Sequence, residues 1–147
     1  MEVQGMAGHL IRRLHQRSVQ VFQAHARRAG LELTAVQFAA MDAIRAHPGI
    51  DQARVAALIA YDRATIGGVI ERLVQKGLVA RKVSPRDRRA RELALTEDGA
   101  RAFAQFLPVV AALQDEILGH LVPAERETFL ALARKAIGPA PDDAPPG

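Results

Sequence analysis

The chain has 147 residues, of which 49% are hydrophobic and 24% charged, so it is long enough for one domain with a sizeable core. It contains no cysteine, which excludes disulfides, thiol catalysis and cysteine-ligated zinc. The formal net charge is +4, from 20 Lys and Arg residues against 16 Asp and Glu residues, so the location of the basic residues matters more than their excess.

The N-terminal half of the chain predicts four helices. Apolar residues at helical spacing predict a first helix over 8–30 that ends at Gly30. Thr34, Asp51 and Asp62 are the expected N-caps of three further helices, because a short polar side chain can accept hydrogen bonds from free N–H groups. The fourth helix carries an apolar stripe made of Ile66, Val69, Ile70, Leu73 and Val74.

A β-hairpin with a cationic tip is expected after the fourth helix. Gly77 ends that helix, and two apolar-alternating stretches, 78–83 and 92–95, then flank a basic segment. Residues 81–91 hold six basic side chains against one acid, with a proline in the middle. Such a run is often only a solvated face, but beside a helix-turn-helix-like segment it favours contact with nucleic acid.

Two long helices complete the predicted fold. Thr96 is expected to cap a fifth helix, and Pro123 to open a sixth that ends before a flexible Pro- and Asp-rich tail at 138–147. The first, fifth and sixth helices carry more apolar surface than the central unit can cover, so we expect a homodimer. The alternative is that these helices fold back on their own domain.

The predicted order of elements is a mainly α, winged helix-turn-helix unit between dimerisation helices, and two motifs give it a family resemblance. Ser84–Ala90 (SPRDRRA) followed by Leu93–Gly99 (LALTEDG) resembles the wing pattern of the MarR (multiple antibiotic resistance regulator) family, Asp-any-Arg followed by Leu-Thr-any-any-Gly. Asp62–Ile66 (DRATI) before Leu73–Leu78 (LVQKGL) is similar to the recognition helix of that family.

The resemblance covers about residues 8–137. It implies one unit over 1–137, with the winged helix-turn-helix at about 33–99 and dimerisation helices at 8–30 and 100–137. It also implies a homodimeric regulator of transcription that binds a pseudo-palindromic double-stranded operator. Many members of the family release the operator when a small phenolic or aromatic anion binds.

The start of the fourth helix holds the expected base contacts. Arg63 suits a bidentate contact to guanine, Thr65 suits a base or a phosphate, and Arg72 suits a phosphate. The alternative for both arginines is a surface ion pair, for example with Glu71 or Asp62.

Gly67 and Gly68 contradict the local helix propensity, because each glycine costs roughly 1 kcal/mol relative to alanine in a helix interior. They permit either a close approach to DNA or close packing of another helix, and both explanations stay open.

The basic hairpin is expected to contact a groove and its phosphates. The resemblance places Arg89 in the minor groove, with Arg88 beside it at the tip. Asp87 is expected to structure the wing by holding an arginine or tying the turn. The remaining expected contacts to phosphate are Gln52, Ser84, Arg86 and Arg91.

A candidate effector site lies on the first helix. His9, Arg13 and Gln16 share one helix face and together can donate to a carboxylate. This opening resembles MarR-family members that govern aromatic-acid catabolism, in which ligand pockets lie between the dimer arms and the DNA-binding unit. We therefore expect an aromatic carboxylate as effector; a polar face that makes inter-subunit hydrogen bonds is the alternative.

Other classes of function are poorly supported by the sequence. None of the five histidines forms an i, i+4 pair, and no nucleophile motif or phosphate-binding glycine loop is present, so neither a metal, a cofactor nor an enzyme is expected. Arg12 and Arg13 interrupt the first apolar stretch, and no apolar run is long enough for a membrane span, so we expect a cytoplasmic protein. Two alternatives stay open: an architectural DNA-binding protein would show little preference for an operator over other DNA, and a protein-interaction module would show almost no salt-dependent affinity for DNA.

Overall fold

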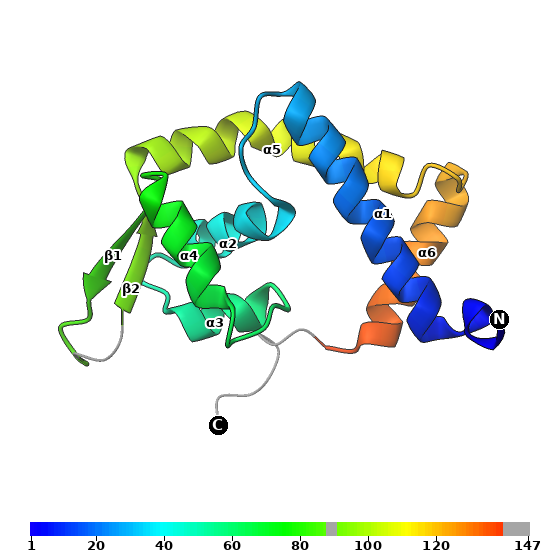
Figure 1. Cartoon of the computed structure of the whole chain (residues 1–147), viewed down its shortest axis with the longest axis horizontal. Coiled ribbons are helices and arrows are strands. Elements are labelled where there is room, and N and C mark those ends of the chain that lie inside the picture. The colour runs from blue at the N-terminus through cyan, green and yellow to red at the C-terminus, as the bar shows by residue number, and fades with distance from the viewer. Residues whose placement is uncertain (88–90, 140–147) are drawn as a thin grey trace.

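Six α-helices and one two-stranded sheet make up the computed structural model, which describes residues 1–87 and 91–139 (Figure 1). The elements are η1 (Glu2–Gly5), α1 (Ala7–Arg28), α2 (Ala35–Ala46), α3 (Gln52–Leu58), α4 (Ile66–Gln75), β1 (Val79–Val83), β2 (Arg91–Leu95), α5 (Glu97–Ile117) and α6 (Pro123–Ile137). This arrangement confirms the expected mainly α fold with a winged helix-turn-helix. The predicted tail begins at residue 138, and its residues 140–147 lie outside the described part of the chain.

Three of the four predicted N-caps are confirmed. Thr34 forms a capping box, because its Oγ1 accepts from the Gln37 amide and Gln37 Oε1 accepts from the Thr34 amide, both at 3.1 Å. Asp51 Oδ1 accepts from Arg54 N at 2.8 Å, and Thr96 Oγ1 accepts from Gly99 N at 3.0 Å.

The prediction that Asp62 caps the fourth helix is wrong. Asp62 Oδ1 accepts from Ala64 N at 3.0 Å, and its carbonyl oxygen accepts from the amides of Thr65 and Ile66, both at 3.1 Å. These bonds close a turn, so α4 begins only at Ile66. The short carboxylate reached the nearest N–H and formed an Asx-type turn instead of a helix cap.

The core joins α2, α4 and β2 to the middle of α5. Its fully buried large side chains include Met41, Ile44, Ile70, Leu73, Leu93 and Leu113. The rings of Phe38 and Phe103 stack with centroids 4.7 Å apart and so hold α2 against α5. The hairpin is antiparallel, with Val79 opposite Leu95, and Ile50 extends its base by pairing with Leu93.

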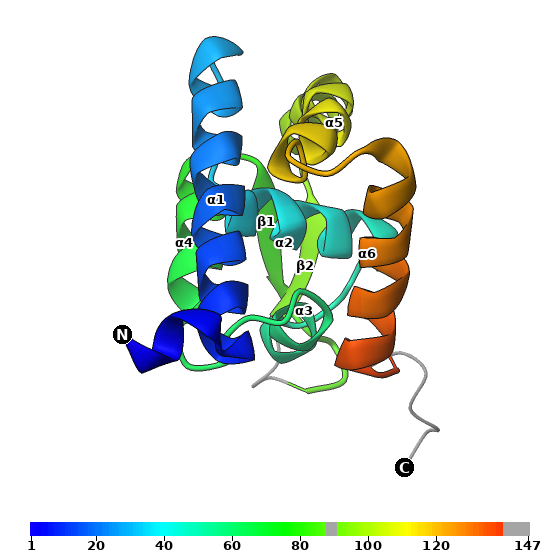
Figure 2. The same ribbon diagram turned by 90° about the vertical axis from the view of Figure 1, so that its right-hand side faces the viewer.

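The end of the molecule opposite the hairpin is formed by α1 and α6 (Figure 2). No residue of α6 is buried within the single chain, and Leu10, Ile11 and Leu132 are 48%, 65% and 59% exposed. The alternative that all the arm helices fold back on their own domain is therefore wrong for α6. This apolar surface is available for a second subunit.

Within residues 1–87 and 91–139, no helix combines the length and the apolar character that crossing a membrane requires.

Candidate nucleic-acid interface

The start of α4 presents Arg63 and Thr65 in the exposed turn that precedes the helix. In Figure 1 this start lies on the same side of the molecule as α3 and the free end of β1. Among the described residues, neither Arg63 nor Arg72 has an ion-pair partner, and Glu71 instead pairs with Arg81 at 2.6 Å. The ion-pair alternative is therefore wrong, and both guanidinium groups remain available to a polyanion.

Packing within the chain does not explain the glycine pair. A Cβ built on Gly67 would lie 3.8 Å from Gln52 Oε1, which is an ordinary contact, and a Cβ on Gly68 would meet nothing within 4 Å. The alternative of close helix packing is therefore wrong within this chain. The same contact places Gln52, at the start of α3, beside the start of α4.

The wing is tied to the recognition helix by a bond that the sequence pattern did not reveal. The Glu71–Arg81 pair joins the exposed side of α4 to β1. Arg86, Asp87 and Arg91 are exposed in this part of the chain. Arg88 and Arg89, expected at the tip, lie outside the described residues.

The expected contact of Ser84 with phosphate needs correction. Ser84 is only 8% exposed, and its hydroxyl oxygen accepts from Arg86 N at 3.2 Å. Burial and this local bond assign Ser84 to holding the loop that leads into the tip.

The Leu-Thr-any-any-Gly motif joins the end of α4 to the start of α5. Thr96 Oγ1 donates to the Gly77 carbonyl at 2.6 Å, and Thr96 N donates to the Leu78 carbonyl at 3.0 Å. At Gly99 the helix passes so close to the turn before β1 that an added Cβ would lie 2.0 Å from Leu78 O. Only glycine fits this crossing, so the motif fixes the position of the wing relative to the core.

A cleft of about 460 Å³ lies between α1, α2 and α4, within the range of small-molecule sites. Its walls combine apolar side chains such as Phe22 and Val69 with polar groups from Tyr61, Thr65 and Arg72. Thr65, Gly68, Val69 and Arg72 come from the recognition helix and the turn before it. A molecule in this cleft would therefore touch the helix that the sequence predicts to face DNA.

Gln37 lines this cleft with a largely buried amide side chain. The residue is 5% exposed, and its Oε1 accepts from Thr34 N and, at 3.4 Å, from Lys76 Nζ. Its Nε2 forms no hydrogen bond with the described residues, although every fully buried side-chain polar atom of these residues has a hydrogen-bond partner. The Nε2 group therefore retains solvent access from within a largely buried side chain.

The three residues of the predicted effector site are brought together, but outside this cleft. His9, Arg13 and Gln16 line a groove of about 420 Å³ along α1, and Val19 is the residue that this groove shares with the cleft. Sequence reasoning missed Gln37 and Tyr61, and it assigned Arg72 to phosphate alone. Nothing in the sequence connects these residues, because three different segments bring them to one cavity.

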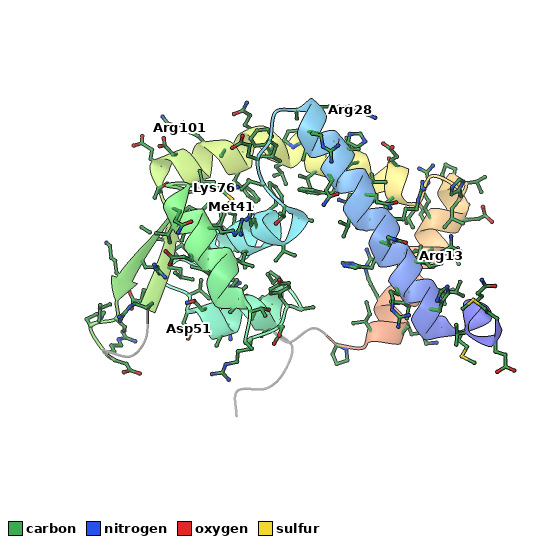
Figure 3. All side chains as sticks on the ribbon, viewed as in Figure 1. Arg13, Arg28, Met41, Asp51, Lys76 and Arg101 are labelled. Atoms are coloured by element: carbon green, nitrogen blue, oxygen red, sulfur yellow. The ribbon has the colours of Figure 1, made fainter. Side chains whose placement is uncertain are left out.

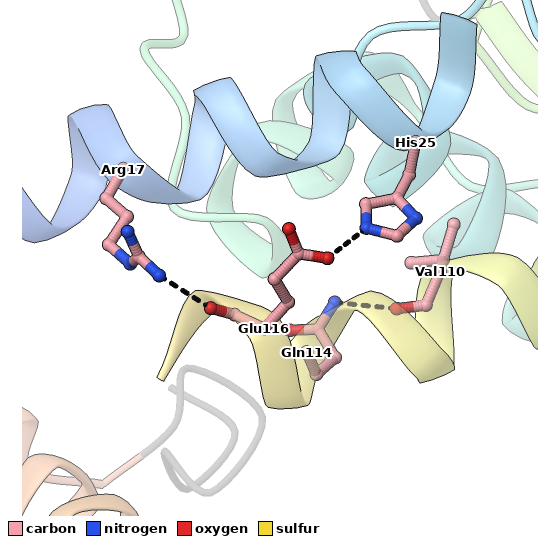
Figure 4. Close-up of polar contacts among 5 residues, drawn as sticks. All are labelled: Arg17, His25, Val110, Gln114 and Glu116. Carbon is pink, nitrogen blue, oxygen red and sulfur yellow. Dashed lines mark hydrogen bonds and ion pairs between the residues drawn. The ribbon is translucent and has the colours of Figure 1, made fainter. Parts of the chain in front are cut away.

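Polar contacts also fix α1 across the end of α5 (Figure 4). Arg17 donates from Nε to the Ile117 carbonyl at 2.8 Å and from Nη2 to the Glu116 carbonyl at 2.9 Å. His25 Nε2 bonds to the Glu116 carboxylate, and this hydrogen bond lowers the pKa of Glu116, with the nearby charges of His25, Arg28 and Arg17 acting in the same direction. These bonds satisfy free carbonyls at the C-terminus of α5 and stiffen the arm.

A family model described as MarR family matches residues 30–90. The HTH-type transcriptional repressor NicR of Pseudomonas putida is 36% identical over 136 residues, which cover 92% of this chain and 85% of NicR. The chain belongs to the MarR family. As a MarR-family protein it is a DNA-binding regulator of transcription that acts as a homodimer, which confirms the prediction from its motifs.

Solved structures of MarR-family proteins agree over nearly the whole length. The Bordetella bronchiseptica regulator BpsR, whose DNA binding is regulated by 6-hydroxynicotinic acid, aligns with a TM-score of 0.81 at 35% identity and covers 97% of this chain and 96% of its own. PcaV of Streptomyces coelicolor, solved with its natural ligand, aligns with a TM-score of 0.81 at 30% identity over 93% and 95% of the two chains. The family is one of transcription regulators.

Proposed function

We propose that this MarR-family protein is a cytoplasmic, non-enzymatic repressor that leaves its operator when a small aromatic acid binds between α1, α2 and α4. One observation carries the proposal: Thr65, Gly68 and Arg72 belong both to the recognition segment and to the wall of a ligand-sized cleft. A ligand that contacts these residues competes with, or tilts, the surface that binds DNA. The proposal draws further support from the repressor NicR and from the response of BpsR to 6-hydroxynicotinic acid.

The proposed protein unit spans residues 1–137, with the DNA-binding part at 33–99. In that part, Arg63 and Thr65 read base edges in the major groove, and the bare backbone of the glycine pair lets α4 approach closely. The remaining proposed contacts are made to phosphate by Gln52, Arg72, Arg86 and Arg91. Asp87 structures the wing, and Arg89 enters the minor groove with Arg88 beside it at the tip.

In the proposed ligand complex, the carboxylate pairs with the Arg72 guanidinium, which suits such a planar anion. The aromatic ring packs against Phe22 and Val69, and a polar ring substituent accepts from Gln37 Nε2. His9, Arg13 and Gln16 form the competing site on the adjoining face of α1.

Ligand binding can be followed without a label. Tyr61 lines the cleft, and it is the single tyrosine in a chain that has no tryptophan, so its fluorescence reports on the cleft. We expect 6-hydroxynicotinic acid or another monocyclic aromatic carboxylate to change this fluorescence in the free protein. The variant Arg72→Gln should lose the response and Arg13→Gln should keep it; the reverse pattern would move the effector to the α1 groove.

DNA binding is tested by fluorescence anisotropy at fixed salt, with an operator selected from a random duplex library. A specific repressor should prefer its operator by at least roughly a thousandfold, whereas an architectural protein would show little preference. Arg63→Ala should weaken operator binding more than non-specific binding. If both fall equally, Arg63 is only a contact to phosphate.

A further inference from the structure

The C-terminal end of α4 is tied to the segment that connects α1 and α2. Lys76, the residue that follows the last turn of α4, donates from Nζ to the Glu32 carbonyl oxygen and, at 3.4 Å, to Gln37 Oε1. Figure 3 shows Lys76 at the end of α4 that lies toward α2. The two acceptors lie 44 and 39 residues away in the sequence, so one ammonium group joins three separate segments.

The acceptor Gln37 is also part of the cleft. Its Oε1 accepts from Thr34 N as half of the capping box that starts α2, and both Thr34 and Gln37 line the cleft between α1, α2 and α4. The start of α2 is therefore at once a cleft wall and the anchor of Lys76. Any shift of this wall changes the position of the anchor relative to α4.

The opposite end of α4 carries the proposed recognition surface. Thr65 lies in the turn before the helix, Gly68 in its first turn and Arg72 in its last turn, so the cleft runs along α4. Lys76 follows directly after the helix, beside the Gly77 carbonyl that Thr96 also holds. A helix held at one end and pressed along one side tilts about the held end. If the far end were free, the same pressure would be relieved by a local shift.

We propose that Lys76 is the positioning residue that couples the ligand cleft to the recognition helix. The inference rests on the proposed function and adds to it the path of regulation: Gln37 and Glu32 anchor Lys76, and Lys76 holds α4 so that occupation of the cleft tilts it. Lys76 contacts neither ligand nor DNA in this role. It changes the ratio of operator affinities with and without ligand, which is the measure of coupling between two sites.

The test compares Lys76→Met, which keeps the aliphatic stem but removes the donor, with Lys76→Arg, which keeps a donor of the same charge. Arg101→Met, at the exposed start of α5, removes one positive charge from a side chain that lines neither the cleft nor the α1–α6 end, and it controls for net charge. Three quantities are measured on the full-length chain. They are the affinity for 6-hydroxynicotinic acid from Tyr61 fluorescence without DNA, and the operator affinity without and with that ligand at saturation.

We expect Lys76→Met to bind the ligand within about threefold of the wild-type affinity. The factor by which the ligand weakens operator binding should be at least about fivefold smaller in Lys76→Met than in the wild type, and fivefold is the lower end of typical allosteric couplings. Lys76→Arg should restore most of the coupling. A ligand effect in Lys76→Met equal to that of the wild type, or an equal reduction in Arg101→Met, would overturn the role of Lys76. A wild-type protein whose operator affinity does not respond to the ligand would instead refute the proposed function itself, and the coupling with it.

Discussion

Replacing Gly99 by alanine tests the junction between the wing and α5. The added Cβ would lie 2.0 Å from Leu78 O and 2.9 Å from Leu78 C, whereas real Cβ atoms essentially never approach other heavy atoms closer than 3.0 Å. Both neighbours are backbone atoms, so no side chain can rotate away. The start of α5 must therefore move from β1 by about 1 Å, the difference between the ordinary limit and the 2.0 Å contact.

That movement weakens the hydrogen bonds that meet at this junction. They are the bonds from Thr96 N to Leu78 O at 3.0 Å, from Gly99 N to Thr96 Oγ1 at 3.0 Å and from Thr96 Oγ1 to Gly77 O at 2.6 Å. Each is worth about 1 kcal/mol net, and overpacking adds about 1–3 kcal/mol. Since some bonds will survive in distorted form, we expect Gly99→Ala to lower the free energy of unfolding by about 3 kcal/mol.

The assay is thermal and urea unfolding followed by circular dichroism at one protein concentration, because the stability of a dimer depends on concentration. For a chain of this size, about 3 kcal/mol corresponds to a fall in Tm of roughly 6–12 °C. Gly68→Ala is the matched control, since its Cβ would meet nothing within 4 Å. A Gly99→Ala variant within about 1 kcal/mol of the wild type would refute the argument from close approach.

Three further predictions follow from single sites. Gly68→Ala should raise the free energy of unfolding by up to about 1 kcal/mol through helix propensity, yet weaken operator binding in anisotropy; unchanged or tighter binding would show that α4 does not need a bare surface there. Ala60 has a φ of 55°, so Ala60→Gly should raise the urea midpoint by relieving about 1 kcal/mol of left-handed strain, and a lower midpoint would contradict this explanation. Because the bond from His25 lowers the pKa of Glu116, their pair stabilises the fold above the ordinary glutamate pKa of about 4.3 and loses this effect as the pH falls through the lower folded-state pKa. The difference in Tm between the wild type and His25→Asn should therefore close on acidification below about pH 4, and a constant difference would assign the effect of His25 to packing.

Features controlled by short stretches of chain were predicted from the sequence. Thr34, Asp51 and Thr96 each cap a helix through bonds to an amide three residues away, and Gly77 ends α4 with a φ of 73°. The short reach of such side chains also explains the wrong prediction at Asp62. Its carboxylate accepts from an amide two residues away and closes a turn before the helix starts. Local hydrogen bonds can be anticipated from residue type and spacing because the chain itself holds their partners within reach.

The cleft proposed to bind the ligand, and its link to α4, depended on tertiary packing. Gln37, Tyr61 and Arg72 come from separate elements, and their meeting at one cavity reflects how α2 and α4 pack, which no local pattern encodes. The bond from Lys76 to Glu32 spans 44 residues and became visible only when α4 was placed against the α1–α2 connection. Contacts between distant segments depend on the angle and register of packed elements, which a sequence pattern does not give. The residue types of α4 therefore predicted DNA binding, and only the tertiary structure placed some of the same residues in the wall of a cleft.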